Sequence, residues 1–138
     1  MGKIVYQLFV AGVPKAQPRP RSGKYGNFYS NTPAIEAWKK EITDAFIPFR
    51  HRQPLNEAVH LRVDFFMPIP KSMKIKEGQQ IPHTKKPDSD NLLKPVQDAM
   101  SRACVWKDDA LVFWPEAPKW YCLGKTGALI TVETGFRE

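Results

Sequence analysis

Cysteine is scarce in this sequence, and its scarcity excludes two kinds of small protein. Cys104 and Cys122 are the only cysteines among 138 residues. They are too few for a disulfide-stabilised scaffold, and neither a CxxC pair nor a histidine at finger-like spacing accompanies them, so we expect no zinc site. The pattern predicts two reduced, partly buried thiols in a cytoplasmic protein.

Two kinds of apolar segment are also missing. No stretch reaches the roughly 18 continuous apolar residues that a membrane-spanning helix needs. The first residues contain no apolar run followed by a small-residue cleavage site, so we expect no signal peptide. With 42% hydrophobic and 12% aromatic residues the chain favours a folded protein, and its length suits one domain, which we place over residues 1–138.

Acidic residues are absent before Glu36 and are outnumbered in the whole chain. The sequence has 21 lysines and arginines against 14 aspartates and glutamates, which gives a net charge of +7. This balance favours a polyanionic partner, in the first place nucleic acid and in the second an anionic membrane surface.

Two proline-rich basic segments are candidates for contact with that partner. Residues 13–32 include Arg19 and Arg21, with aromatic residues just beyond them, and we expect no regular structure there. Residues 68–87 form a long basic loop that includes Lys85 and Lys86. Basic residues on such loops can contact phosphates, and aromatic residues can stack on bases. A solvated surface loop is the alternative interpretation.

The remaining patterns predict an α+β domain. A helix begins at the capping Thr32, buries Trp38, leaves Lys39 on its polar side and ends or bends at Pro48. A second helix is predicted over 90–103. Strand patterns, one of them bent or at a sheet edge because prolines interrupt it, lie at 3–12, 57–67, 110–122 and 128–134. The order β-α-β-α-β-β predicts one mixed sheet with helices packed on it.

The most informative motif is the run Lys86-Pro87-Asp88-Ser89-Asp90-Asn91-Leu92-Leu93-Lys94. Pro87 disfavours helix before it, so we expect an extended chain at Asp88, where residues i and i+2 face the same way. Asp88 and Asp90 can then present oxygen atoms to one ion, and Asp90 lies where a helix N-cap belongs.

Beyond Asp90 the helical spacing separates polar from apolar residues. At 100° per residue Asp90, Lys94 and Asp98 share one side of the predicted helix. Pro95 should cost little there if the helix begins at or after Asp90. The opposite side is apolar and consists of Leu92, Val96, Ala99, Met100 and Ala103.

These residue types suit phosphodiester hydrolysis. Mg²⁺ takes oxygen ligands, usually one or two carboxylates with water and phosphate, and it lowers the pKa of a bound water. Lys94 can stabilise charge that develops on the phosphate, and Asp109 can complete the ligand set. The spacing also permits a simpler interpretation, in which Asp90 only caps a helix, Asp98 is solvated, and Asp108 and Asp109 form a turn.

Residues 86–100 and 105–112 closely resemble the RusA family of Holliday junction resolvases, which is common in bacteriophages and prophages. The segments 12–14 and 19–21 and the order of elements extend this resemblance over most of the chain. The resemblance implies an endodeoxyribonuclease that depends on Mg²⁺, or on Mn²⁺ in its place, and resolves four-way DNA junctions as a homodimer.

The same resemblance assigns roles to individual residues. It implies that Asp88, Asp90 and Asp109 bind the metal ion and that Lys94 is the essential lysine, with Asp98 in a supporting position. Two other functions stay open: a non-catalytic basic module that binds nucleic acid, and a nuclease that acts on other branched DNA. The histidines are unpaired in sequence and are expected on surfaces or loops, with His83 a candidate phosphate contact; they are His51, His60 and His83.

Overall fold

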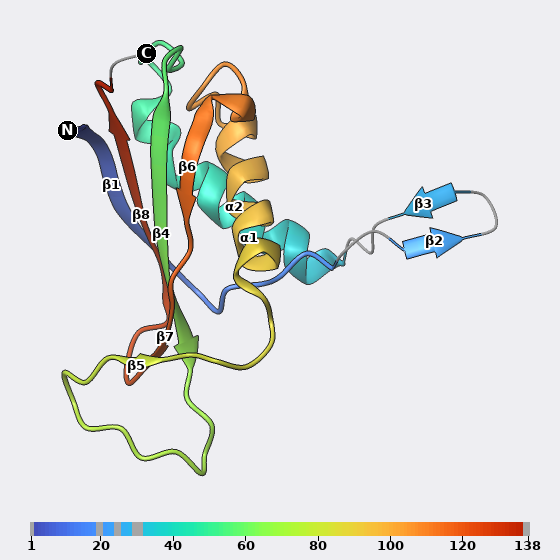
Figure 1. The fold of residues 1–138 in the computed structure, drawn as a ribbon, viewed down its shortest axis with the longest axis vertical. Coiled ribbons are helices and arrows are strands. Elements are labelled where there is room, and N and C mark those ends of the chain that lie inside the picture. The colour runs from blue at the N-terminus through green and yellow to red at the C-terminus, as the bar shows by residue number, and fades with distance from the viewer. Residues whose placement is uncertain (1, 19–20, 24–25, 29–31, 137–138) are drawn as a thin grey trace.

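A six-stranded mixed sheet organises the fold, and strand β4 (Val59–Pro68) lies at its centre (Figure 1). On one side β4 pairs antiparallel with β8 (Gly127–Thr134), which pairs antiparallel with the outer strand β1 (Lys3–Ala11). These strands match the predicted ones closely. The computed structural model describes residues 2–18, 21–23, 26–28 and 32–136.

On its other side β4 is flanked by two shorter strands. The single bent strand predicted at 110–122 is divided at Ala117 and Pro118 into β6 (Val112–Glu116) and β7 (Lys119–Cys122), both parallel to β4. A short strand β5 (Ile81–Pro82) pairs with β7, so the basic loop at 68–87 contains a strand that we did not predict. Two residues are too few to leave a visible sequence pattern.

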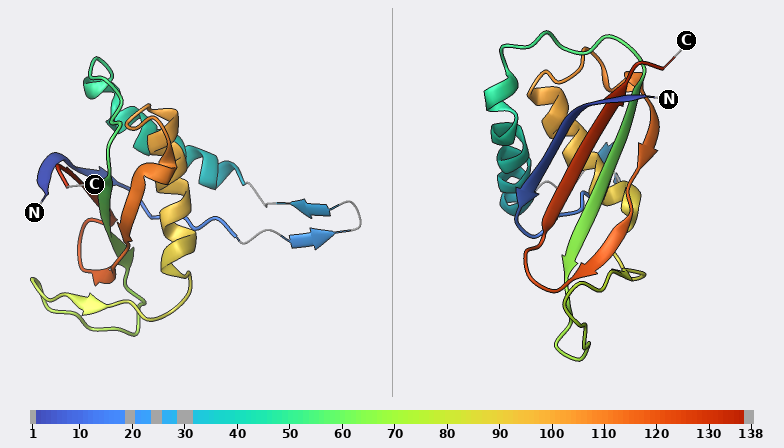
Figure 2. Two further views of the ribbon diagram at one scale, coloured as in Figure 1. Left: turned by 45° about the horizontal axis from the view of Figure 1, so that its top comes forward. Right: turned by 90° about the vertical axis from the view of Figure 1, so that its left-hand side faces the viewer.

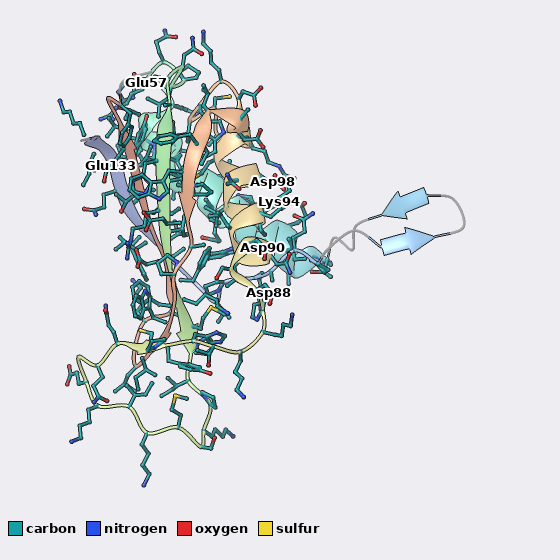
Figure 3. The ribbon with its side chains drawn as sticks, in the orientation of Figure 1. Glu57, Asp88, Asp90, Lys94, Asp98 and Glu133 are labelled. Atoms are coloured by element: carbon teal, nitrogen blue, oxygen red, sulfur yellow. The ribbon has the colours of Figure 1, made fainter. Side chains whose placement is uncertain are left out.

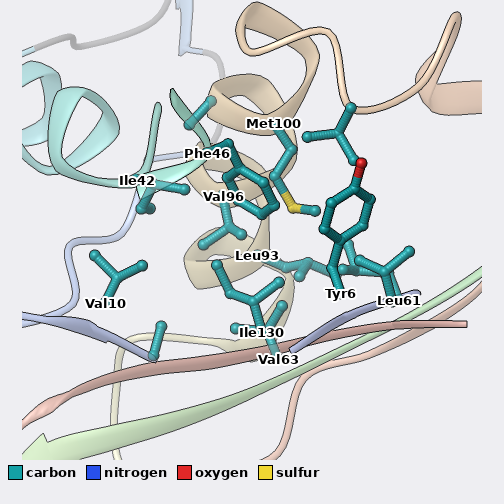
Figure 4. Packing of buried hydrophobic residues seen from close by; sticks show 14 of the residues in the cluster. Tyr6, Val10, Ile42, Phe46, Leu61, Val63, Leu93, Val96, Met100 and Ile130 are labelled. Carbon is teal, nitrogen blue, oxygen red and sulfur yellow. The ribbon is translucent and has the colours of Figure 1, made fainter. Parts of the chain in front are cut away.

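Helices α1 (Pro33–Ala45) and α2 (Ser89–Arg102) cover one face of this sheet, as two views show (Figures 1 and 2). Their apolar sides and the facing sides of β1, β4 and β8 form the core. Figure 4 shows its centre, which includes Tyr6, Val10, Ile42, Phe46, Leu61, Val63, Leu93, Val96, Met100 and Ile130. In the described part of the chain neither helix is long and apolar enough to cross a membrane.

Helix α1 begins as the sequence predicts. The Thr32 Oγ1 atom accepts a hydrogen bond of 3.2 Å from the backbone N–H of Ile35, and Trp38 is buried. The helix ends at Ala45, before a 3₁₀ turn η1 (Ile47–Phe49) that contains Pro48. Lys39 lies off the apolar side of α1, as the spacing predicts, but it is only 4% exposed because α2 packs beside α1.

Helix α2 begins one residue before the predicted start, which places Pro95 further inside the helix than we expected. A proline removes the N–H that would donate to the carbonyl four residues earlier. That carbonyl belongs to Asn91, and it accepts a hydrogen bond of 2.9 Å from the backbone N–H of Gln17. The segment after β1 therefore satisfies the carbonyl that Pro95 releases and is fastened to α2.

The segment 13–32 is not wholly irregular, which corrects a second prediction. Strands β2 (Arg21–Gly23) and β3 (Gly26–Phe28) form an antiparallel hairpin that projects from the body of the protein (Figures 1 and 2). The prolines that argued against regular structure all precede Arg21. Residues 21–28 contain none, so no proline prevents the two short strands from pairing.

The face of the sheet away from the helices carries a partly buried polar network, in which His60 and Asp64 are buried and Arg62 and Glu116 are half-buried. Arg62 donates to both carboxylate oxygens of Asp64, at 3.0 and 3.1 Å, and to Glu116 at 3.1 Å. The Nε2 atom of His60 lies 2.7 Å from Glu116, and its ring stacks on Trp114. His60 is therefore buried and paired, contrary to the surface position expected for the histidines.

The C-terminal end of α2 forms a Schellman motif. The backbone N–H of Val105 donates to the Met100 carbonyl, and the N–H of Cys104 donates to the Ser101 carbonyl. Cys104 has φ 57°, in the left-handed region, at the position of this motif where glycine is usual. Its side chain is exposed, which corrects the prediction of a partly buried thiol. Cys122 is half-buried, and both cysteines are free.

We predict that Cys104→Gly stabilises the protein. A side chain in the left-handed region costs about 1–2 kcal/mol, which glycine avoids, although its greater freedom in the unfolded chain offsets part of the gain. Urea unfolding should show a net increase of about 0.5–1 kcal/mol in the free energy of unfolding. Cys104→Ala is the matched control, since alanine keeps the β-carbon. An equal gain from both variants would contradict this explanation.

Candidate active site

Helix α2 presents the predicted polar stripe on the side that faces away from the sheet. Asp90 and Lys94 are exposed, and the side chain of Asp98 is 27% exposed (Figure 3). Four residues of the predicted apolar side, Leu92, Val96, Ala99 and Met100, are each 0% exposed, while the fifth, Ala103, is the C-cap and is half-buried. Because this burial fixes the rotation of the helix, it also fixes the direction of the polar stripe.

Asp88 occupies the N-cap of α2, a position that we had predicted for Asp90. Its backbone is extended, with φ −69° and ψ 150°, and its carbonyl accepts from the N–H of Leu92 at 3.1 Å. Asp90 follows in the first turn. Both carboxylates thus lie at the end of the helix that carries partial positive charge, where negative charge is stabilised. Lys86 is 3.0 Å from Asp88.

Asp98 has a supporting contact that the sequence did not indicate. Its Oδ2 atom lies 3.4 Å from Nζ of the buried Lys39, and its Oδ1 atom accepts from Lys94 at 3.3 Å. Glu36 is a more distant neighbour of Lys39, at 3.9 Å. Asp98 therefore supplies negative charge to a lysine enclosed between α1 and α2, because a buried ammonium is costly without a partner.

Asp108 and Asp109 have different positions. Asp108 caps the 3₁₀ turn η2 (Asp109–Leu111), where its side chain accepts from the N–H of Ala110 at 2.9 Å. Asp109 is the first residue of that turn and is exposed. Sequence alone could not separate these neighbours, because the capping contact depends on the backbone of the turn.

The described chain does not bring the three predicted metal ligands together. Asp109 lies just before β6, and β6 begins beside Val59 at the start of β4. Asp88 lies near the other end of β4: the carbonyl before it, from Pro87, accepts from Lys119, and Lys119 pairs with Phe65. The two points are separated by about 20 Å along β4 at the usual rise per strand residue. Within the described residues no three aspartate, glutamate, histidine or cysteine side chains gather around a possible metal position.

Asp88 and Asp90 alone offer a donor set that suits a magnesium ion. Carboxylates at one helix end supply hard oxygen ligands, and one or two carboxylates with water and phosphate are a common arrangement. The extended backbone at Asp88 agrees with the sequence-based prediction, but Asp90 lies in the first turn of α2, so the two carboxylates share a helix end and not the face of an extended chain. The assignment of all three aspartates to a metal ion stays a prediction.

The predicted DNA-binding residues are only partly described. Arg19 lies outside the described residues, and Arg21 is placed only as a backbone position in β2. Lys85 is exposed, while the side chain of Lys86 is 86% exposed even though it pairs with Asp88. Contact of these residues with DNA remains a prediction.

Two further residues lie beside this site: Lys119, which the sequence did not indicate, and His83, which we predicted only as a candidate phosphate contact. The Nζ atom of Lys119 donates to the carbonyls of Lys85 and Pro87, at 2.8 Å each, just before Asp88. His83 lies beside Tyr121, with ring centroids 4.6 Å apart. Burial, with the nearby Lys119 cation in second place, lowers the pKa of His83 below its usual 6.5.

The fold and the polar stripe of α2 define a single-domain α+β protein with acidic residues and a lysine grouped on one exposed helix face. A family model described as endodeoxyribonuclease RusA matches residues 11–133. The chain therefore belongs to the RusA endodeoxyribonuclease family, a family of DNA hydrolases that acts on Holliday junctions.

A curated relative supports the same membership. The chain is 32% identical over 123 residues to a Bacillus subtilis (strain 168) protein described as "Uncharacterized protein YqaN". The alignment covers 81% of this chain and 84% of that protein, so the similarity extends over most of both.

We predict that His83 makes stability fall as the solution is acidified. The unfolded imidazole gains its proton near pH 6.5 and the native one only at lower pH, so the unfolded state binds more protons in that interval. The free energy of unfolding should decrease as pH falls through about 6.5, and less steeply in His83→Gln. Melting temperatures at several pH values test this. His51→Gln, at an exposed position, is the control, and equal slopes for wild type and His83→Gln would contradict the prediction.

We predict that Asp98→Asn destabilises the protein by about 1–3 kcal/mol, because it leaves the ammonium of Lys39 buried with a neutral neighbour. Urea unfolding measures the change. Lys39→Met should reduce the cost of Asp98→Asn, since the methionine has no charge to neutralise. Additive effects in this double-mutant cycle would show that the pair does not interact.

Proposed function

We propose that this protein is a metal-dependent endonuclease that resolves four-way DNA junctions by paired phosphodiester hydrolysis. The observation that supports the proposal most directly is the position of Asp88 and Asp90 at the positive end of α2, with Lys94 on the same exposed side. A net charge of +7 favours approach to DNA, while the carboxylates provide a local place for a cation. We place this activity in the cytoplasm.

In the proposed site Asp88 and Asp90 hold a Mg²⁺ ion, for which Mn²⁺ can substitute. When bound, such an ion polarises a phosphoryl oxygen and provides a water of lowered pKa. Lys94 follows Asp90 by one helical turn, and its ammonium can stabilise negative charge that builds up on the phosphate. Its contact with Asp98, at 3.3 Å, holds the side chain along the exposed stripe.

We propose that the protein acts as a homodimer, since symmetric cleavage of a junction needs two sites related by a two-fold axis. About 20 Å along β4 separates the start of β6, which follows Asp109, from the point where Lys119 holds the entry to Asp88, so Asp109 does not join Asp88 and Asp90 within this conformation of one chain. A second copy placed against the first can supply its own Asp109. The dimer would then provide two sites related by a two-fold axis and would complete the metal ligands of each site.

The basic segments would bind the DNA arms. Arg19 and Arg21 belong to the segment that contains the projecting hairpin, and Lys85 and Lys86 immediately precede the carboxylates. In this arrangement the arginines contact phosphates away from the reacting bond, while the lysines contact phosphates beside it. Such contacts give affinity without sequence readout, as expected for a protein that recognises the shape of a branch.

Two alternative functions assign different roles to the carboxylates. As a non-catalytic module the protein would use its acidic residues structurally, and the contacts of Asp98 and Asp108 do show structural roles. As a nuclease for other branched DNA it would use the same site on flaps or forks. Purified protein with Mg²⁺, tested on junction, flap, duplex and single-stranded DNA, separates all three.

We predict that Asp88→Asn, Asp90→Asn and Asp109→Asn each abolish cleavage of a four-way junction and leave binding intact or tighter. Asparagine keeps the shape of the side chain but removes the charge that holds the metal ion and repels phosphate. Gel-based cleavage and binding assays measure both properties. Asp108→Asn is the matched control beside Asp109, and loss of cleavage from Asp108→Asn alone would reverse the assignment within this pair.

Mixing two inactive variants tests how the copies share ligands. If a site takes Asp90 from one copy and Asp109 from the other, a hybrid of Asp90→Asn with Asp109→Asn contains one intact site and one doubly altered site. Refolding the two variants together should then restore nicking of one strand. If each site is built from one copy, both sites in the hybrid stay defective and no nicking returns.

A further inference from the structure

Lys119, the first residue of β7, is bonded through both its backbone and its side chain to the segment that leads into α2. Its carbonyl accepts a hydrogen bond of 3.0 Å from the N–H of His83. Its ammonium donates to the carbonyls of Lys85 and Pro87, at 2.8 Å in each case. One residue thus holds three points of the segment 83–87.

The next residue after this segment is Asp88, so the Lys119 contacts decide where the candidate site begins. Pro87 supplies a carbonyl to Lys119, and the following carbonyl, from Asp88, accepts the first backbone hydrogen bond of α2. The extended entry and the helix are therefore fastened at consecutive peptide groups. A small displacement at Pro87 would move the Asp88 carboxylate relative to Asp90, which the helix holds.

The surroundings of Lys119 distinguish it from the lysines expected to touch DNA. Lys85 and Lys86 are exposed, whereas Lys119 is half-buried on a strand whose backbone pairs with Phe65 of β4. Its two short hydrogen bonds direct the ammonium toward the backbone of its own chain. Hydrogen bonds from a charged donor are shorter and stronger than neutral ones, so this contact can hold a loop in place.

We propose that Lys119 is a positioning residue of the nuclease site, which clamps the entry segment of α2 so that Asp88 and Asp90 keep their spacing. This inference rests on the proposed function only for its effect on cleavage. The clamp itself concerns how firmly the backbone of residues 83–88 is held in place, and it can be tested without DNA. Groups that orient metal ligands commonly change metal affinity or activity by about 10- to 100-fold when they are removed.

The test compares Lys119→Met, which keeps the length of the side chain and removes the donors, with Lys119→Arg, which retains charged donors. Lys125→Met is the control, because Lys125 is exposed on the turn after β7 and its ammonium lies 5.6 Å from the ring of Phe9. Each variant is assayed for hydrogen exchange at the amides of His83 and Leu92, for Mn²⁺ binding by water proton relaxation, and for junction binding and cleavage.

For Lys119→Met we expect faster exchange at both amides and Mn²⁺ binding that is weaker by about tenfold or more. Turnover should fall by about 10- to 100-fold, with junction affinity little changed because few phosphate contacts are lost. Lys119→Arg should recover much of each property, and Lys125→Met should match wild type. If Lys119→Met does not fold, Lys119→Gln, which keeps one neutral donor, takes its place in the comparison with Lys119→Arg.

The outcomes separate this inference from the proposed function. Wild-type exchange, Mn²⁺ binding and turnover in Lys119→Met would overturn the clamp, whether or not the protein is a nuclease. A matched loss of junction affinity and turnover with unchanged exchange would overturn it too, and would make Lys119 a docking residue. If the wild-type protein fails to cleave any branched DNA, the nuclease proposal falls, and exchange and Mn²⁺ binding still decide the role of Lys119.

Discussion

Burial of α2 against the middle of the sheet is the constraint on which the rest of the structure depends. Four inward residues of β4 and four residues of the apolar stripe of α2 are 0% exposed and belong to one core cluster. Each fully buried aliphatic or aromatic side chain contributes about 1.5–3 kcal/mol, so rotating α2 to hide its polar stripe would cost many times the strength of any contact in that stripe. The core therefore decides which way Asp90 and Lys94 face.

Polar contacts then set the details that apolar packing leaves open. Packing fixes the rotation of α2, but the entry to the helix is held by Lys119, and the carbonyl freed by Pro95 is held by Gln17. Asp98 links α2 to α1 through the buried Lys39. Each contact involves a group that is costly to bury without a partner, so the contacts contribute specificity as well as stability.

The periodicity of apolar residues in the sequence was sufficient to predict the helices and strands that bury one side. It predicted β4, both helices and the polar stripe of α2, because these patterns repeat over several turns or strand residues. It did not reveal the burial of Lys39, since a helical projection shows the polar side of α1 but not that α2 covers part of it. It also could not reveal Lys119, whose partners are backbone carbonyls, which every residue possesses.

Charge is distributed unequally over the two faces of the sheet, and this bears on how DNA would approach. The face without helices carries the carboxylates of Asp64 and Glu116, which are joined to the Arg62 guanidinium and the His60 ring in one hydrogen-bonded network. Phosphates would gain little there and would meet negative charge. On the helix side Lys94 stands on the exposed stripe, and the basic entry segment leads directly into Asp88. If DNA binds as proposed, this is the side on which its phosphates would meet exposed lysines next to the carboxylates, since Lys86 pairs with Asp88 and Lys94 follows Asp90 by one helical turn.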